Sequence, residues 1–212
     1  MSSTGPRSQR MDKAIIRGPM DVSPLSDDVT EILPNLFLGS EAGARNLEML
    51  RKRGITHILT VMVDPVPRGA TAAEDGFRRM QIPVQDWPDQ ELMTYFKDAN
   101  NFIDAARVTA QEAVLVHCYQ GVSRSATIVA AYLMASHPPL HDDDSAALAF
   151  LRARRPIVHP NSGFLAQLAL YGRCGCDLDA HPTAVEAWRA GAGADAHMAR
   201  GSGETWGLDG GG

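Results

Sequence analysis

Apolar residues occur along the chain in short dense runs and in longer stretches with helical spacing. Four runs are rich in β-branched and other apolar side chains and bounded by Gly, Pro or polar residues, which is typical of strands. We expect strands at residues 35–39, 55–63, 79–84 and 113–116. The density of apolar residues in 55–63 indicates a strand that is covered on both faces.

Five longer stretches place apolar residues three and four positions apart, as on one face of an amphipathic helix. We expect helices at residues 42–53, 91–110, 125–135, 144–154 and 161–172. Helices that alternate with strands along a chain are typical of a mostly parallel sheet. The pattern therefore predicts a single α/β domain, with a central, mostly parallel sheet flanked by helices.

The two ends of the chain have a different composition from the middle. Residues 1–28 are rich in Ser, Pro, Gly and Asp, and the last 22 residues contain eight glycines. Such segments bury little apolar surface, so we expect a disordered N-terminal tail at 1–28 and a mostly disordered C-terminal extension at 176–212. The domain itself is then expected at residues 29–175.

Composition and charge narrow the class of protein. With 44% hydrophobic and 21% charged residues, the 212-residue chain is typical of a soluble globular protein. Its net charge of -5 gives no overall attraction to nucleic acid or anionic membranes, and no apolar segment approaches the length of about 20 residues that a membrane-spanning helix needs. Three cysteines and the absence of a visible export signal favour the reducing cytosol or nucleus.

The most informative residues lie between the apolar run at 113–116 and the helix expected from 125. Cys118 stands at the end of a strand, followed by a short loop that opens a helix. Backbone N–H groups converge at such a loop, where the helix dipole is positive, so the loop can bind a phosphate dianion and favour the reactive thiolate. Arg124 can clasp two phosphoryl oxygens with its planar fork, and Gly121 lets the backbone turn close to the ligand.

If the thiolate attacks a phosphate ester, hydrolysis of that ester also needs a group that protonates the leaving oxygen and later activates water. A carboxylic acid is suited to both roles. Asp86 and Asp89, ahead of the helix expected at 91–110, are the two candidates.

These residues form a known signature. His117, Cys118, Arg124 and Ser125 match the pattern His-Cys-x5-Arg-Ser of the cysteine-dependent protein tyrosine phosphatases, and the rest of the loop resembles the dual-specificity branch. Further segments similar to that family lie at residues 32–40, 54–59, 95–96, 155–156 and 160–164. The resemblance covers about residues 30–172 and implies a protein tyrosine phosphatase-like fold, a cysteinyl-phosphate intermediate and no metal or other cofactor.

The resemblance also implies roles for individual residues. Cys118 would be the nucleophile, His117 would orient the loop and tune the thiol, and Ser125 would donate a hydrogen bond to the departing sulfur. The phosphate-binding residues would be Tyr119, Gln120, Gly121, Val122, Ser123 and Arg124. Asn161 would brace the loop.

For the acid, the resemblance favours Asp86. Dual-specificity members have Asp, five residues, Leu and then an aromatic pair, which Asp86 fits with Leu92 and the pair at 95–96. The tripeptide at 87–89 spells the acid loop of the classical tyrosine phosphatases and nominates Asp89 instead. We expect Asp89 to cap the helix that follows.

The end of the domain is similar to the Yvh1 group of atypical dual-specificity phosphatases, but the chain lacks the cysteine-rich zinc domain of its better-known members. The pair Cys174 and Cys176 lacks the second pair of a structural zinc site, so we expect free thiols, with a redox partner for Cys118 as the alternative. The arginines at 152, 154 and 155 either stabilise a helix C-terminus or receive a second phosphate.

Two functional hypotheses follow. The favoured one is a protein phosphatase that acts on phosphotyrosine and on phosphoserine or phosphothreonine. The absence of lysine at Tyr119, Gln120 and Val122 makes phosphoinositides and RNA ends less favoured substrates. The alternative is a phosphoprotein-binding scaffold on the same fold, against which the intact Cys118, Arg124 and Asp86 argue.

Overall fold

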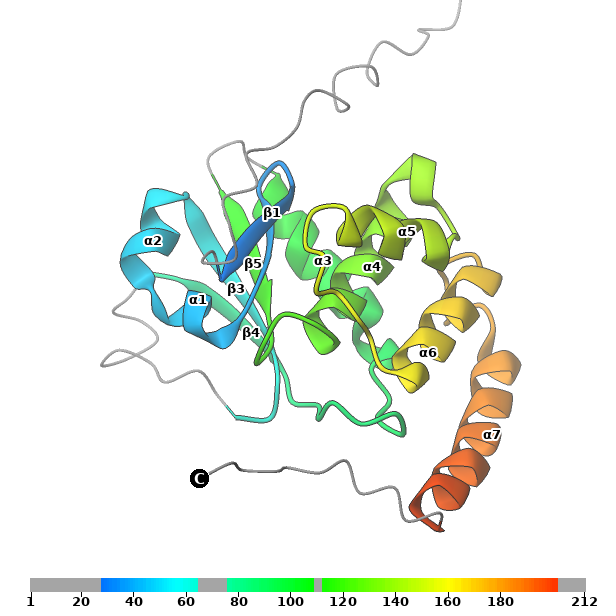
Figure 1. Ribbon diagram of the computed structural model, residues 1–212. Coiled ribbons are helices and arrows are strands. Elements are labelled where there is room, and N and C mark those ends of the chain that lie inside the picture. The colour runs from blue at the N-terminus through cyan, green and yellow to red at the C-terminus, as the bar shows by residue number, and fades with distance from the viewer. Residues whose placement is uncertain (1–27, 65–75, 109–111, 202–212) are drawn as a thin grey trace, which may run out of the picture.

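A five-stranded sheet forms the centre of the protein, with helices on both of its faces (Figure 1). The computed structural model describes residues 28–64, 76–108 and 112–201. The strands are β1 (Val29–Leu33), β2 (Leu36–Gly39), β3 (Ile55–Val61), β4 (Arg78–Ile82) and β5 (Ala113–His117). They lie in the order β1-β2-β5-β3-β4, and only the β1-β2 pair is antiparallel. The expected α/β fold with a mostly parallel sheet is confirmed.

The helices are arranged in two layers. Two short helices, α1 (Glu41–Arg45) and α2 (Leu47–Lys52), cover one face of the sheet (Figure 1). The other face is covered by the larger layer, which contains α3 (Phe96–Arg107), α4 (Arg124–Ser136), α5 (Asp144–Arg152) and α6 (Ser162–Arg173), with the short 3-10 helices η1 (Met93–Tyr95) and η2 (Pro138–Leu140).

The central strand β5 shows why both faces are covered. Val114 and Val116 belong to the apolar cluster under the larger layer, whereas Ala113 and Leu115 belong to the cluster under α1 and α2. Successive strand residues point to opposite faces, so a strand that is apolar at four successive positions, as β5 is from Ala113 to Val116, needs a layer on each side. All five residues of β5 are buried.

The parallel strands bring their carboxyl ends to one edge of the sheet, where ligands of open α/β folds bind. The segment with Cys118 leaves β5 at this edge and leads into α4. The segment with Asp86 leaves β4, two strands away, and leads through η1 into α3. The topology therefore brings together two segments that are distant in the sequence.

Several element boundaries differ from the sequence-based expectation. The helix expected at 42–53 is divided at Asn46, which ends α1 and caps α2 by accepting a hydrogen bond from the Met49 N–H. The helix expected at 91–110 starts as a 3-10 turn and becomes α-helical only at Phe96; residues 109 and 110 lie outside the described residues. Strand β1 was not predicted, because two of its five residues are polar.

The C-terminal extension also differs. We expected it to be mostly disordered, but Pro182–Gly201 form the helix α7. Its first turns pack against the core through Val185, which is buried, and Trp188. A proline at the first helical position and frequent alanines favour this helix, and apolar packing offsets the cost of its glycines. The N-terminal tail expected at 1–28 lies, except for Asp28, outside the described residues.

Within the described ranges, no helix is long and apolar enough to cross a membrane.

Candidate active site

The loop formed by residues 118–124, called the phosphate loop below, places Cys118 at its base. Cys118 is 2% exposed, and its Sγ atom accepts hydrogen bonds from the Gly121 N–H at 3.3 Å and from the Ser125 hydroxyl at 3.1 Å. Both donors stabilise negative charge on the sulfur, as does the N-terminus of α4 that follows. The loop therefore holds its sulfur in a setting that suits a thiolate.

The carbonyl oxygens of residues 119–122 all accept hydrogen bonds from outside the phosphate loop. The Arg155 guanidinium binds two of them, the Gly121 oxygen from Nε at 3.0 Å and the Gln120 oxygen from Nη2 at 2.9 Å. The backbone N–H groups of Glu41 and His159 bind the other two, at 3.0 and 2.9 Å. Because each peptide unit points its N–H opposite to its carbonyl, these contacts leave the N–H groups of the loop to face an anion.

The position of Gly121 requires glycine for two reasons. Its φ of +71° lies in the left-handed region, which L side chains rarely adopt. A Cβ atom here would also lie 2.5 Å from the Gly39 carbonyl oxygen and 2.9 Å from Nη2 of Arg155. The turn can therefore approach both the end of β2 and the Arg155 side chain only without a side chain of its own.

His117 lies beneath the loop, fully buried. Its Nδ1 atom is 3.2 Å from the Cys118 carbonyl oxygen, and its Nε2 atom is 2.8 Å from the Thr60 hydroxyl. Burial lowers the pKa of His117 to about 4, so the ring is neutral at physiological pH. The carbonyl can only accept, so Nδ1 carries the proton and Nε2 accepts from Thr60. His117 thus orients the backbone at Cys118 through a fixed tautomer.

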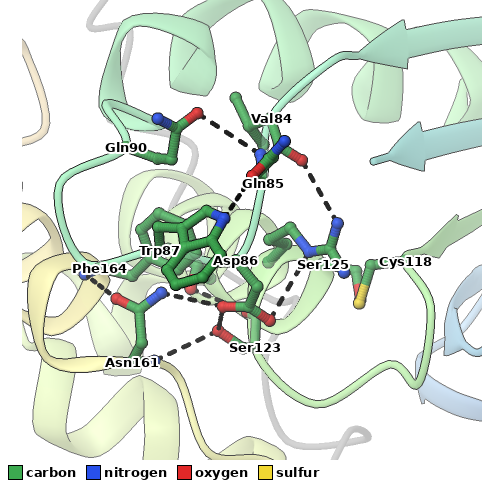
Figure 2. Close-up of polar contacts among 12 residues, drawn as sticks. Val84, Gln85, Asp86, Trp87, Gln90, Cys118, Ser123, Ser125, Asn161 and Phe164 are labelled. Carbon is green, nitrogen blue, oxygen red and sulfur yellow. Dashed lines mark hydrogen bonds and ion pairs between the residues drawn. The ribbon is translucent and has the colours of Figure 1, made fainter. Parts of the chain in front are cut away.

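Asp86 contacts the phosphate loop from the segment that follows β4. Its Oδ1 atom accepts hydrogen bonds from the Ser123 hydroxyl at 2.6 Å and from Nδ2 of Asn161 at 2.9 Å. Its Oδ2 atom lies 3.6 Å from Nε of Arg124, an ion pair too long for a hydrogen bond. Figure 2 shows the carboxylate directed toward Ser123 and Asn161. Nη1 of Arg124 also donates to the Val84 carbonyl oxygen, at 3.3 Å.

The orientation of the Asn161 amide follows from its position as the N-cap of α6. Its Oδ1 atom accepts a hydrogen bond of 3.0 Å from the Phe164 N–H (Figure 2). The amide oxygen is thereby committed to the helix, and the NH₂ group must face Asp86. The Asn161 backbone N–H donates to Ser123 Oγ at 3.2 Å, so this residue does brace the phosphate loop.

Asp89 does not cap the following helix, contrary to expectation. Neither η1 nor α3 has a cap at Asp89, and the N–H groups of Leu92 and Met93 instead donate to Oε1 of Gln167, at 2.7 and 2.9 Å. Gln167, on α6, is fully buried. Sequence reasoning missed this contact because its partners are more than 70 positions apart.

Arg155 was also misread, since we expected it to stabilise a helix C-terminus or receive a second phosphate. It is 7% exposed and binds the phosphate loop, and burial lowers its pKa, an effect opposed by the charges of Cys118 and Asp28. Arg154 does meet a helix end, donating to the Phe150 carbonyl oxygen at 3.2 Å.

The structure does not bring Cys174 and Cys176 to Cys118. Cys174 follows the C-terminus of α6, whereas the N-cap of that helix contacts Asp86, and the two ends of a 12-residue helix are roughly 18 Å apart. All three cysteines are free, and burial raises the pKa of Cys176 to about 12. In the part of the chain that the structure describes, no group of three His, Cys, Asp or Glu residues could hold a metal ion.

Comparisons with known proteins agree with this arrangement. Residues 36–174 match the sequence model of the dual specificity phosphatase catalytic domain. The chain is 42% identical over 141 residues to dual specificity protein phosphatase 1B of Arabidopsis thaliana, covering 66% of this chain and 80% of the relative. It is 37% identical over 179 residues to dual specificity protein phosphatase MPK-4 of Drosophila melanogaster, covering 84% of this chain but 44% of the length of the fly protein.

Among solved structures, the Yvh1 phosphatase domain from Chaetomium thermophilum is similar, with a TM-score of 0.63 and 32% identity over 70% of this chain and 97% of that domain. The extent of the family match and its agreement with the fold described above lead to one conclusion: the chain belongs to the dual specificity phosphatases of the cysteine-based protein tyrosine phosphatase superfamily.

Proposed function

We propose that the protein hydrolyses phosphotyrosine and phosphoserine or phosphothreonine in proteins through a cysteinyl-phosphate intermediate. The observation that carries this proposal is the environment of Cys118: its sulfur accepts two hydrogen bonds inside a loop whose carbonyl oxygens at 119–122 are all bound outward. Such a loop offers its N–H groups to three phosphoryl oxygens, with Arg124 beside them.

In the first step, the thiolate of Cys118 attacks phosphorus and the bond to the leaving oxygen breaks. That oxygen takes a proton from Asp86, which approaches from the segment after β4. Arg124, 13% exposed, gives a planar fork to the developing charge on the phosphoryl oxygens. The products are the free alcohol or phenol and phosphocysteine.

In the second step, Asp86 takes a proton from a water molecule as the water attacks phosphorus. The phosphorus–sulfur bond breaks and the thiolate is restored. The Ser125 hydroxyl, already 3.1 Å from the sulfur, stabilises it as the leaving group. Inorganic phosphate is released, and no metal ion takes part in the proposed steps.

Support for protein substrates comes from the family and from the rim of the site. The relatives reported above are named dual specificity protein phosphatases. Tyr119 and Trp87, adjacent in sequence to the nucleophile and the proposed acid, are 61% and 56% exposed and offer apolar surface to a peptide. The free thiols support a reducing compartment, cytosol or nucleus, as the place of action.

The proposal is tested with p-nitrophenyl phosphate in the presence of a chelator. The wild type should turn over this substrate, and acid quenching should trap phosphate covalently bound to the protein. Cys118→Ser should abolish both signals, whereas the control Cys176→Ser should retain them. Activity that survives Cys118→Ser would exclude the cysteine mechanism. A folded wild type that binds tungstate but hydrolyses nothing at any pH would instead support the phosphoprotein-binding scaffold.

A further inference from the structure

The segment between β4 and η1, residues 83–92, is called the acid loop below because it carries Asp86. Its residues 85–88 are exposed. Besides the contacts of Asp86 with Ser123 and Arg124, and of Val84 with Arg124, which are described above, the acid loop is held by α6 and by its N-cap Asn161.

The first contact is at the carboxylate itself. Nδ2 of Asn161 donates to Oδ1 of Asp86 at 2.9 Å, with the amide orientation set by the cap of α6. The Ser123 hydroxyl donates to the same oxygen at 2.6 Å, so the two bonds hold the carboxylate at one atom and leave the backbone of the acid loop to be fixed by other contacts.

The second contact is steric and lies two residues further along both segments. A Cβ atom at Gly163 would lie 1.8 Å from the Pro88 carbonyl oxygen and 2.5 Å from its carbonyl carbon. Real Cβ atoms do not approach other heavy atoms this closely, so the backbone of the acid loop rests directly on the first turn of α6. Any side chain at position 163 must push the acid loop away from the helix.

The third contact fixes the far end of the acid loop. Gln167, fully buried, accepts from the N–H groups of Leu92 and Met93 and donates from Nε2 to the Gln90 carbonyl oxygen at 2.8 Å. One side chain thereby satisfies three backbone groups where the acid loop meets η1. An unpaired buried backbone group costs about 1–3 kcal/mol, so the contact is a strong one.

We infer that Gly163 and Gln167 are positioning residues for the general acid: α6 and its N-cap hold the acid loop at three points and keep Asp86 next to the phosphate loop. The inference rests on the proposed role of Asp86 as proton donor. It assigns to α6, which otherwise packs in the core, an indirect part in protonation of the leaving group, through the position of Asp86.

A positioning role can be separated from a merely structural one by the choice of leaving group. The value of kcat/KM reports formation of phosphocysteine, which needs a proton for phenyl phosphate but hardly for 2,4-dinitrophenyl phosphate, whose leaving group is stable as an anion. Gly163→Ala should therefore reduce kcat/KM for phenyl phosphate by about 10²-fold, the size expected for a misplacement of about 1 Å, and leave the dinitrophenyl substrate nearly unchanged. Gln167→Met should act in the same direction.

In an Asp86→Asn background the same substitutions should not reduce kcat/KM for phenyl phosphate any further, because the carboxyl group that they position is already absent. The control is Gly191→Ala, a helical glycine with no heavy atom within 4 Å of an added Cβ. The Gly163 and Gln167 variants should bind tungstate with wild-type affinity. This result would show that their phosphate loop is intact.

An equal loss of kcat/KM for both substrates, or a loss of kcat/KM that adds to that of Asp86→Asn, would overturn the inference while leaving the proposed function in place. If Asp86→Asn itself does not distinguish the two substrates, the acid assignment fails, and the inference fails with it.

Discussion

The hydroxyl group of Ser123 donates a 2.6 Å hydrogen bond to Oδ1 of Asp86, across 37 positions of sequence. Ser123 belongs to the phosphate loop and Asp86 to the acid loop, so this bond joins the segment that carries the proposed nucleophile to the one that carries the proposed proton donor. The same hydroxyl accepts from the Asn161 N–H, which gives Ser123 a fixed orientation.

The position of Asp86 leads to a first prediction about the proton donor. Asp86→Asn should reduce turnover of phenyl and alkyl phosphates by about 10²- to 10⁴-fold, because the amide cannot supply a proton to the leaving oxygen. Asp89→Asn serves as the matched control and should remain close to the wild type. Steady-state kinetics of both variants decide the assignment, and the reverse result would show that the tripeptide at 87–89 identifies the acid.

A second prediction concerns Arg155, which binds the Gln120 and Gly121 carbonyl oxygens. Arg155→Lys keeps the charge but loses the fork that reaches both oxygens, so the phosphate loop should lose its fixed shape. We expect vanadate to bind at least about 10-fold more weakly, since one lost hydrogen bond of a charged donor contributes about 1.5–3 kcal/mol. Isothermal titration measures this affinity. Arg154→Lys, at the neighbouring helix end, is the control, and equal weakening in both variants would contradict a specific role for Arg155.

A third prediction concerns the stability of the fold as pH falls. The pKa of His117 is about 4 in the folded protein and about 6.5 in an unfolded chain, so the unfolded state binds more protons between these values. The contribution of His117 to the free energy of unfolding is therefore fully present above about pH 6.5. It is lost as pH falls toward 4, by on the order of 3 kcal/mol.

Urea unfolding at pH 7.5 and pH 5 measures this loss. His117→Asn removes the titrating ring, and its free energy of unfolding should vary less over the same interval. An identical pH dependence in the wild type and the variant would show that other groups account for it.

A fourth prediction concerns α7. Val185 is 8% exposed, and Val185→Ala removes buried methyl groups, which should lower the free energy of unfolding by about 1 to 2 kcal/mol. The ion pair between Arg189 and Glu91 is exposed, so Arg189→Gln should leave the melting temperature unchanged at physiological salt. Thermal unfolding of the two variants makes the comparison, and an unchanged stability of Val185→Ala would mean that α7 does not dock on the core.

Features that depend on apolar runs or on the spacing of nearby residues could be predicted from the sequence. Apolar runs located β2, β3, β4 and β5, and the spacing of Cys118 and Arg124 located the phosphate loop. Asp86 could be chosen over Asp89 from its distance to Leu92, although its contacts with Ser123 and Asn161 required the fold.

The remaining features depend on contacts between distant segments. Local sequence gives no sign that Thr60 binds His117 or that Arg155 binds the phosphate loop. For the contact of Gln167 with the start of η1, the one local signal is a glutamine among the apolar residues of α6. The packing of Val185 and Trp188, in the first turns of α7, against the core is likewise a contact that composition alone does not predict.

The outward fixing of the carbonyl oxygens at 119–122 has a consequence for how the reaction ends. A cradle of backbone N–H groups recognises the tetrahedral oxyanion and not the group attached to it, so we expect it to bind liberated orthophosphate as well. Inorganic phosphate should then compete with substrate, and the rate of the enzyme should depend on the phosphate concentration of its surroundings.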